Sequence, residues 1–315
     1  MRPLCSISID LDPLRCYYRI HGLGDAPPDD VVVARAVERF AAIFAARGIA
    51  ATFFVVAEEI DTATFGESKR AARAAIAEAA ACGHEIASHS YSHPYELARL
   101  DRERVDDELG RAHDLLAEVA GGTITGFRAP GYDLSPVMVE GLCRLGYTYD
   151  SSLFPAPAYY AAKAAIMAAM AASGRKSGAV LTNPRAQLAP ADPYRPSPSA
   201  PWRRGDAPLM ELPVAVTPWL HIPAIGTSLL LAPAALRSRL VAAMARRAHF
   251  NFELHALDLI DAEIDGIPAP VIARQPDLRR PLANKRAAFE AVLDDIGERF
   301  EVVCLRDAAA RFSAS

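Results

Sequence analysis

Two histidines with the spacing of metal ligands, His89 and His93, stand in the run HEIASHSYSHPY at residues 84–95. The apolar residues that alternate before His89 are typical of a short strand, and Pro94 disfavours a long helix after it. Two imidazoles four residues apart can bind one cation, and Zn²⁺ is common in such pairs. Because so short a pattern also occurs on solvent-exposed loops, a third ligand must come from elsewhere in the chain.

Acidic residues near the N-terminus are candidates for that third ligand. An apolar run at residues 4–9 predicts a strand, and Asp10 and Asp12 follow it on either side of Leu11. Two histidines and one carboxylate leave a position for water, as in a catalytic rather than a structural zinc site. Either Asp12 or Asp10 can be the metal ligand, and the other carboxylate can then act as the general base. Side chains alternate along a strand, so both carboxylates project to the same side and the two roles can be exchanged.

Three more residues of catalytic type, Arg128, Asp150 and His255, come at the ends of other predicted strands. In a (β/α) barrel the chemistry takes place at the carboxyl ends of the strands. The planar guanidinium of Arg128 could hold the base carboxylate in place, and His255 could protonate a leaving amine. These residue types together predict a metal-assisted hydrolysis of an amide.

Strands and helices alternate along most of the chain. The predicted strands are residues 4–9, 51–56, 84–88, 123–127, 147–149, 209–216, 249–254 and 300–305, and the predicted helices are residues 30–47, 68–81, 101–119, 135–145, 234–247 and 284–299. About seven such units favour an α/β fold with a distorted (β/α) barrel over an open sheet. We expect a single barrel domain over residues 1–315. An alanine-rich piece followed by a stretch dense in proline and arginine predicts a helical and loop insertion at about residues 156–208.

The composition argues against several classes of protein. The chain has 315 residues, of which 51% are hydrophobic and 23% charged, enough for a large α/β core. A net charge of −4 disfavours a nucleic-acid partner. Five scattered cysteines without a CxxC pair favour reduced thiols. The N-terminal run reaches acidic residues too early for a signal peptide, so we expect a cytoplasmic protein.

The motifs IDLD, HSYSH, FRAPGY, YDSS and ELH occur in this order over roughly residues 4–259. This set resembles the polysaccharide deacetylase (NodB-like) superfamily, also called carbohydrate esterase family 4. The resemblance implies a distorted (β/α) barrel and a divalent metal, most often Zn²⁺, although ions such as Co²⁺ or Ni²⁺ occur. It also implies that His89 and His93 bind this metal, that Arg128 orients the base, and that His255 is the general acid.

The same resemblance suggests further site residues. A backbone N–H near the third motif binds the oxyanion in the family, which points to Tyr132. Two departures are visible, because Leu11 separates the two aspartates and the fourth motif lacks the usual tryptophan. With the resemblance as a guide, we assign Asp12 to the metal and Asp10 to the general base. Asp150 and Asp258 are candidates to tune a catalytic partner.

The function that we predict is a metal-dependent hydrolase that removes an acetyl or formyl group from an N-acylated amino sugar, which can be lipid-linked. One alternative is hydrolysis of a cyclic imide or ureide, as in allantoinase-like members of the superfamily, and another is a barrel that binds a glycan without catalysis. The predicted helix at residues 234–247 combines four apolar residues with arginines, which allows peripheral contact with the inner face of an anionic membrane. The sequence does not indicate an oligomeric state.

Overall fold

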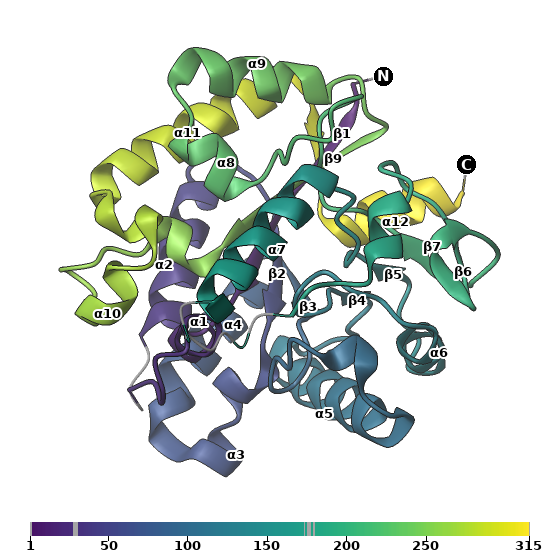
Figure 1. The fold of residues 1–315 in the computed structure, drawn as a ribbon, viewed down its shortest axis with the longest axis horizontal. Coiled ribbons are helices and arrows are strands. Elements are labelled where there is room, and N and C mark those ends of the chain that lie inside the picture. Colours follow the sequence, from purple (N-terminus) through teal and green to yellow (C-terminus); the bar gives the residue numbers. More distant parts are fainter. Residues whose placement is uncertain (1, 28–30, 173, 175–177, 179, 315) are drawn as a thin grey trace.

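A curled parallel sheet with helices on its outer side forms the frame of the molecule (Figure 1). The structure, a computed structural model, describes residues 2–27, 31–172, 174, 178 and 180–314. The strands of this sheet are β1 (Leu4–Leu11), β2 (Thr52–Val55), β3 (Glu85–Ser88), β4 (Gly126–Phe127), β5 (Tyr149–Asp150), β8 (Met210–Glu211), β9 (His249–His255) and β10 (Glu301–Val302).

Strand β1 is the centre of the sheet, and every one of its residues is buried. It pairs with β9 along nearly its whole length, while its other edge is shared by β10 at the start and β2 at the end. From β2 the order continues through β3, β4 and β5 to β8. The chain after β8 then returns to β9, where the N–H of Ala215 donates to the carbonyl of Asn251 at 3.2 Å. The predicted distorted barrel of about seven parallel strands is thereby confirmed.

Helices cover the outside of this sheet. They are α1 (Leu14–His21), α2 (Val32–Ala45), α3 (Thr62–Phe65), α4 (Arg70–Ala81), α5 (Arg102–Ala120), α6 (Pro136–Arg144), α7 (Pro157–Ala172), α8 (Gly226–Leu231), α9 (Ala234–Met244), α10 (Ala269–Ile272), α11 (Leu282–Arg299) and α12 (Leu305–Ser313). Phe40 and Phe44 of α2 pack against Phe289 of α11, with ring centroids 5.4 and 6.0 Å apart. Such contacts join helices that are distant in sequence and give the barrel its outer core.

The predicted helices and strands are present, with differences at their ends. The expected start of the second helix at residue 30 lies outside the described residues. Strands β4, β8 and β10 are shorter than predicted, because only part of each apolar run forms ladder hydrogen bonds. Residue 305 was expected in a strand but begins α12. The sequence does not predict the short helices α1, α3, α8, α10 and α12, since such helices carry too little periodic pattern to be recognised.

The segment predicted as an insertion contains helix α7 and a small antiparallel pair, β6 (Pro196–Ser197) with β7 (Ala200–Arg204). Helix α7 lies across the front of the barrel in Figure 1. None of its residues is buried. Within the described ranges, no helix combines the length and apolarity that a bilayer crossing requires.

Gly126 marks a close approach between two strands and provides a test of the packing. A Cβ at this position would lie 2.1 Å from the ring of Tyr149, which is fully buried and donates a hydrogen bond to Glu85 Oε1 at 2.9 Å. We expect Gly126→Ala to lower the free energy of unfolding by about 1–3 kcal/mol, because the ring must move and its buried hydrogen bond is strained.

Gly110 in α5 is the matched control, since nothing lies within 4 Å of a Cβ added there. Gly110→Ala should raise the stability by about 0.5–1 kcal/mol through helix propensity alone. Urea unfolding followed by circular dichroism measures both variants. Equal stabilities of Gly126→Ala and the wild type would contradict the packing of β4 against Tyr149.

Candidate active site

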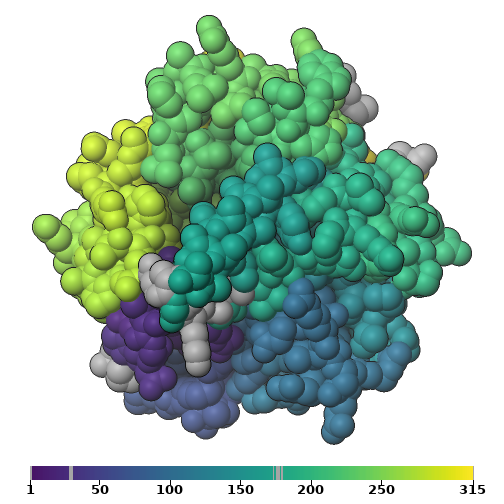
Figure 2. Space-filling view, in the orientation of Figure 1, coloured from purple at the N-terminus to yellow at the C-terminus, as the bar shows by residue number. Residues whose placement is uncertain are grey.

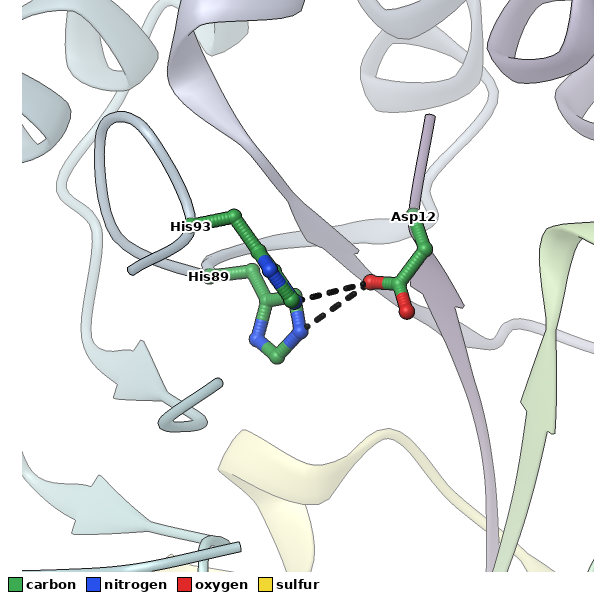
Figure 3. A group of neighbouring side chains, drawn as sticks. All are labelled: Asp12, His89 and His93. Atoms are coloured by element: carbon green, nitrogen blue, oxygen red, sulfur yellow. Dashed lines mark ion pairs between the residues drawn. The ribbon is translucent and has the colours of Figure 1, made fainter. Parts of the chain in front are cut away.

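Asp12, His89 and His93 meet at the carboxyl ends of β1 and β3 (Figure 3). Asp12 follows β1, His89 follows β3, and His93 lies in the turn after it. The Nε2 atoms of His89 and His93 are 3.3 and 3.2 Å from the same oxygen, Asp12 Oδ1. All three side chains are buried. The structure thus brings together the three residues that the sequence assigns to a metal.

The turn that carries His93 has an unusual backbone. Ser90 and His93 have φ values of 64° and 60°, in the left-handed region that side chains with a Cβ rarely adopt. Ser90 Oγ accepts a hydrogen bond from the N–H of His93 at 3.1 Å. The N–H groups of Tyr91 and Ser92 donate to Glu108 Oε2 at 3.0 and 2.9 Å. These bonds hold a strained turn in place, as is common where backbone strain orients functional side chains.

The hydrogen bonding of the triad fits a divalent cation. His89 Nδ1 is 2.7 Å from the carbonyl oxygen of Arg128, which can only accept, so Nδ1 carries the proton. In the neutral ring, the lone pair of His89 Nε2 then faces Asp12 Oδ1, a buried oxygen without a hydrogen-bond partner among the described residues. Burial favours the neutral carboxyl, but His93 and His89 hold the pKa of Asp12 well below its usual value. A proton on Nε2 or a cation between the two atoms satisfies this contact, and two imidazoles with one carboxylate are a ligand set that a divalent cation takes.

Asp10 is held by Arg128, as the sequence predicts for the general base. Arg128 is completely buried, and its Nη1 is 2.5 Å from Asp10 Oδ1. Its other nitrogens donate to Ser8 Oγ at 3.0 Å and to the carbonyl of Ser151 at 2.9 Å, and the guanidinium lies 4.2 Å above the ring of Phe54. The arginine is therefore fixed on several sides and leaves Asp10 little freedom to rotate.

His255 ends β9 and faces a carboxylate that the sequence analysis missed. Its Nε2 is 3.5 Å from Glu253 Oε1 and 3.3 Å from the hydroxyl of Tyr132, which also donates to Glu253. Burial raises the pKa of Glu253 to about 7. Burial would lower the pKa of His255, but Glu253 first, and Asp12 and Asp10 after it, raise it to about 9. The alternation of side chains in ELH could have revealed Glu253, because it places both residues on one face of the strand.

Asp10, Glu253 and His255 also offer ligand atoms within 4.8 Å of one another. Asp10 is already paired with the cationic Arg128. His255 has a pKa of about 9, so it is protonated and cationic at neutral pH. Two positive groups disfavour a further cation here, so Asp12, His89 and His93 remain the better metal site.

The remaining predicted residues take different positions. Asp258 accepts a hydrogen bond from the backbone N–H of His255 at 2.9 Å, and burial raises the pKa of its carboxyl to about 6. It therefore positions the chain that carries the predicted acid. The backbone N–H of Tyr132 makes only a long hydrogen bond, 3.4 Å, to the carbonyl of Ala129. Its role toward an oxyanion stays a prediction, and the hydroxyl of Tyr132 adds a contact to His255 that the sequence did not indicate.

Asp150 is not brought to the other site residues. It is fully buried, its carboxylate accepts from the N–H and hydroxyl of Ser152 at 3.0 and 2.7 Å, and it stands in register with Glu211 of β8. Burial and the neighbouring Asp150 hold the pKa of Glu211 well above its usual value, so this pair keeps a proton. The carboxylate of Asp150 fixes the turn after β5 and does not touch His255.

One pocket of about 300 Å³ contains the predicted metal ligands, base and acid. Tyr159 and Lys163 of α7 form one wall, and Thr227 and Leu231 of α8 contribute to another. In Figure 2 the surface is hollowed beside the teal helix α7, towards the green and yellow-green C-terminal segments. The insertion therefore shapes the entrance to the site.

Part of the chain is similar in sequence to known deacetylases. A family model described as "Polysaccharide deacetylase" matches residues 25–149, a range that includes His89, His93 and Arg128. The peptidoglycan deacetylase of Helicobacter pylori is 28% identical over 155 residues, which are 48% of this chain and 49% of that protein. The match thus spans about half the length of this curated relative.

A solved structure shares the fold of this chain. It comes from Mycobacterium smegmatis, carries the designation polysaccharide deacetylase, and is 18% identical with a TM-score of 0.58. The superposition covers 100% of this chain and 92% of that one. The family match over residues 25–149, the partial match to the H. pylori protein and the shared fold make this chain similar to polysaccharide deacetylases of the NodB-like family.

Proposed function

We propose that the protein is a metal-dependent N-deacetylase that hydrolyses the acyl amide of an amino sugar. The observation that carries this proposal is the presence, in one pocket, of the triad Asp12, His89 and His93 beside Asp10 and His255. Two imidazoles and one carboxylate form the ligand set of a catalytic zinc site. Zn²⁺ is the ion that we propose, with Co²⁺ or Ni²⁺ as alternatives of similar ligand preference.

The chain's own groups suit both proton transfers of the reaction. When bound, the cation would polarise the amide carbonyl and acidify the attacking water. Asp10, oriented by Arg128, accepts the proton of that water as the oxygen adds to the carbonyl carbon. His255, protonated below a pKa of about 9, donates a proton to the nitrogen as the C–N bond breaks. The products are a carboxylic acid and a free amine.

The proposed substrate is an N-acetylated or N-formylated amino sugar, free or linked to a lipid. The name of the H. pylori relative supports a substrate of the peptidoglycan type. Ile225 and Leu231 add apolar surface to the pocket, which suits the methyl group of an acetyl or an apolar neighbour of the sugar.

The test is amine release from soluble N-acetylglucosamine oligomers and peptidoglycan fragments, together with their N-formyl analogues, by protein loaded with zinc. We expect free amine and carboxylic acid to appear in equal amounts. Asp10→Asn, which keeps the shape of the side chain, should reduce kcat by about 10²–10⁴ because it cannot accept a proton. Hydrolysis of cyclic imides or ureides, with no amine released from any sugar, would instead select the allantoinase-like reaction.

A further inference from the structure

An exposed apolar hairpin at residues 216–223 lies in the chain between β8 and α8. Val216 and Pro223 form an antiparallel bridge, and the N–H of Thr217 donates to the carbonyl of Ile222 at 2.8 Å. At the tip, the side chains of Trp219 and Leu220 are 80% and 74% exposed. Two large apolar residues that are adjacent and exposed differ from the isolated apolar side chains that most surfaces carry.

The conformation of this tip is fixed by its surroundings. Trp219 and His221 have φ values of 61° and 50°, which are unfavourable for residues with a Cβ. His221 Nδ1 donates to the carbonyl of Pro155 at 2.7 Å, and Thr217 Oγ1 accepts from the N–H of Ile222 at 3.0 Å. The hairpin is therefore built to present Trp219 to solvent.

Unpaired arginines lie beside the hairpin. The guanidinium of Arg246 is 5.3 Å from the centre of the Trp219 ring, and Arg239 lines the same groove of about 440 Å³ between the hairpin and α9. Neither arginine has a carboxylate partner within the described part of the chain, whereas the next residue, Arg247, pairs with Asp192 at 3.3 Å. Two cations without a carboxylate partner among the described residues thus lie beside exposed apolar groups.

Helix α9 itself does not offer the apolar face that the sequence suggested for membrane contact. Val241 and Met244 are buried in the core, so the apolar stripe of the helix packs against the barrel. Leu236 is half exposed and lies, by helical spacing, on the same face as Arg239. The exposed apolar surface comes mainly from the hairpin, which the sequence analysis did not single out.

We propose that this surface docks the protein on an anionic lipid bilayer. We call it the Trp219 surface, and it consists of Trp219, Leu220, Ile222, Leu236, Arg239 and Arg246. Tryptophan is favoured at the boundary between headgroups and acyl chains, and leucine can enter the apolar layer. Arginines without acidic partners attract anionic headgroups. This combination of charge and apolar exposure selects an anionic membrane over a neutral one.

The position of the Trp219 surface connects docking with the pocket. Helix α8 follows the hairpin and contacts α9, and its residues Thr227 and Leu231 line the pocket. Docking therefore holds the pocket near the bilayer surface, within reach of a substrate whose anchor stays in the membrane. The docking itself does not depend on which amide the pocket hydrolyses.

Co-sedimentation of the full chain with extruded vesicles tests the proposal. At low salt we expect binding to vesicles of phosphatidylcholine with phosphatidylglycerol, little binding to phosphatidylcholine alone, and release in high salt. The Trp219→Ala, Leu220→Ala double variant and the Arg239→Gln, Arg246→Gln double variant should each weaken binding at least about tenfold. Ile264→Ala and Arg104→Gln, at exposed positions elsewhere, are the matched controls and should bind as the wild type does.

A spectroscopic readout separates insertion from adsorption. The chain has two tryptophans, so in a Trp202→Phe variant all tryptophan emission comes from Trp219. This emission should shift to the blue only with anionic vesicles. Absence of binding at low salt, or binding that is unchanged in both double variants, would overturn the proposal. So would a dimer of the wild type, seen by light scattering, that the hairpin variant abolishes, because the surface would then serve a second copy of the chain.

Discussion

Replacement of His89 and His93 together by alanine should remove the bound metal. In protein purified without chelators and exposed to Zn²⁺, we expect about one ion per chain for the wild type and none retained by the variant, because Asp12 alone is a single ligand. Amide hydrolysis should fall to the background rate with the loss of the ion. Elemental analysis by mass spectrometry measures the metal, and the activity assay follows on the same samples.

The control for this prediction is a buried histidine outside the site. His84 packs between the rings of Phe44 and Phe53, and its Nδ1 accepts from the N–H of Ala51 at 3.2 Å. His84→Ala should lower the stability, as the loss of any packed ring does, yet keep the metal. A wild type that takes up neither Zn²⁺, Co²⁺ nor Ni²⁺ would rule out the metal-dependent mechanism. Retention of the ion by the double variant would show that the metal binds elsewhere and not at these histidines.

A second large effect is expected on the pH dependence when Glu253 loses its charge. His255 acts as an acid only while it is protonated, and the neighbouring carboxylate of Glu253 helps to raise its pKa to about 9. Glu253→Gln removes this charge at 3.5 Å, so the pKa of His255 should fall by about one to three units. The alkaline limb of the kcat/KM profile then moves to lower pH by the same amount, and activity above neutral pH decreases.

Tyr132→Phe separates the charge of Glu253 from the hydrogen bond that it accepts. The variant removes the hydroxyl that contacts both His255 and Glu253 but leaves the carboxylate, so its alkaline limb should stay closer to that of the wild type. A kcat/KM profile of Glu253→Gln that coincides with the wild-type profile would show that Glu253 does not control His255. Thermal unfolding of both variants checks that the buried site remains intact.

Much of the fold was readable from local pattern. The apolar runs and amphipathic stretches predicted the main strands and helices, because strand and helix periods are properties of a few successive residues. Boundaries were less predictable. Residue 305 begins a helix although the residues before it are apolar, since β10 pairs with β1 only at Glu301 and Val302 before the chain leaves the sheet. Pairing with β1, and not propensity, decides where that strand ends.

By itself, the sequence determined the residue types of the site and their order along the chain. HSYSH supplies two imidazoles at the spacing of metal ligands, and IDLD places two carboxylates on one side of a strand. Only the tertiary structure decided how these groups are paired. Arg128 directly follows β4 and pairs with Asp10, which leaves Asp12 to the histidines. That choice depends on how distant strands are rotated relative to one another, which no local pattern encodes.

The same reason explains why Asp150 lies apart from the site and why Glu253, which the sequence did not indicate, lies within it. Asp150 and Glu253 both lie on strands next to the site, but β5 turns the first toward Ser152 and Glu211, while β9 turns the second toward His255. The exposure of Trp219 is likewise a tertiary result, because the hairpin is held away from the core by contacts with Pro155 and α9. Residue types and spacings follow from the chain alone, whereas the partners of each buried charge follow from packing, because only the folded barrel determines which groups share the space from which water is excluded.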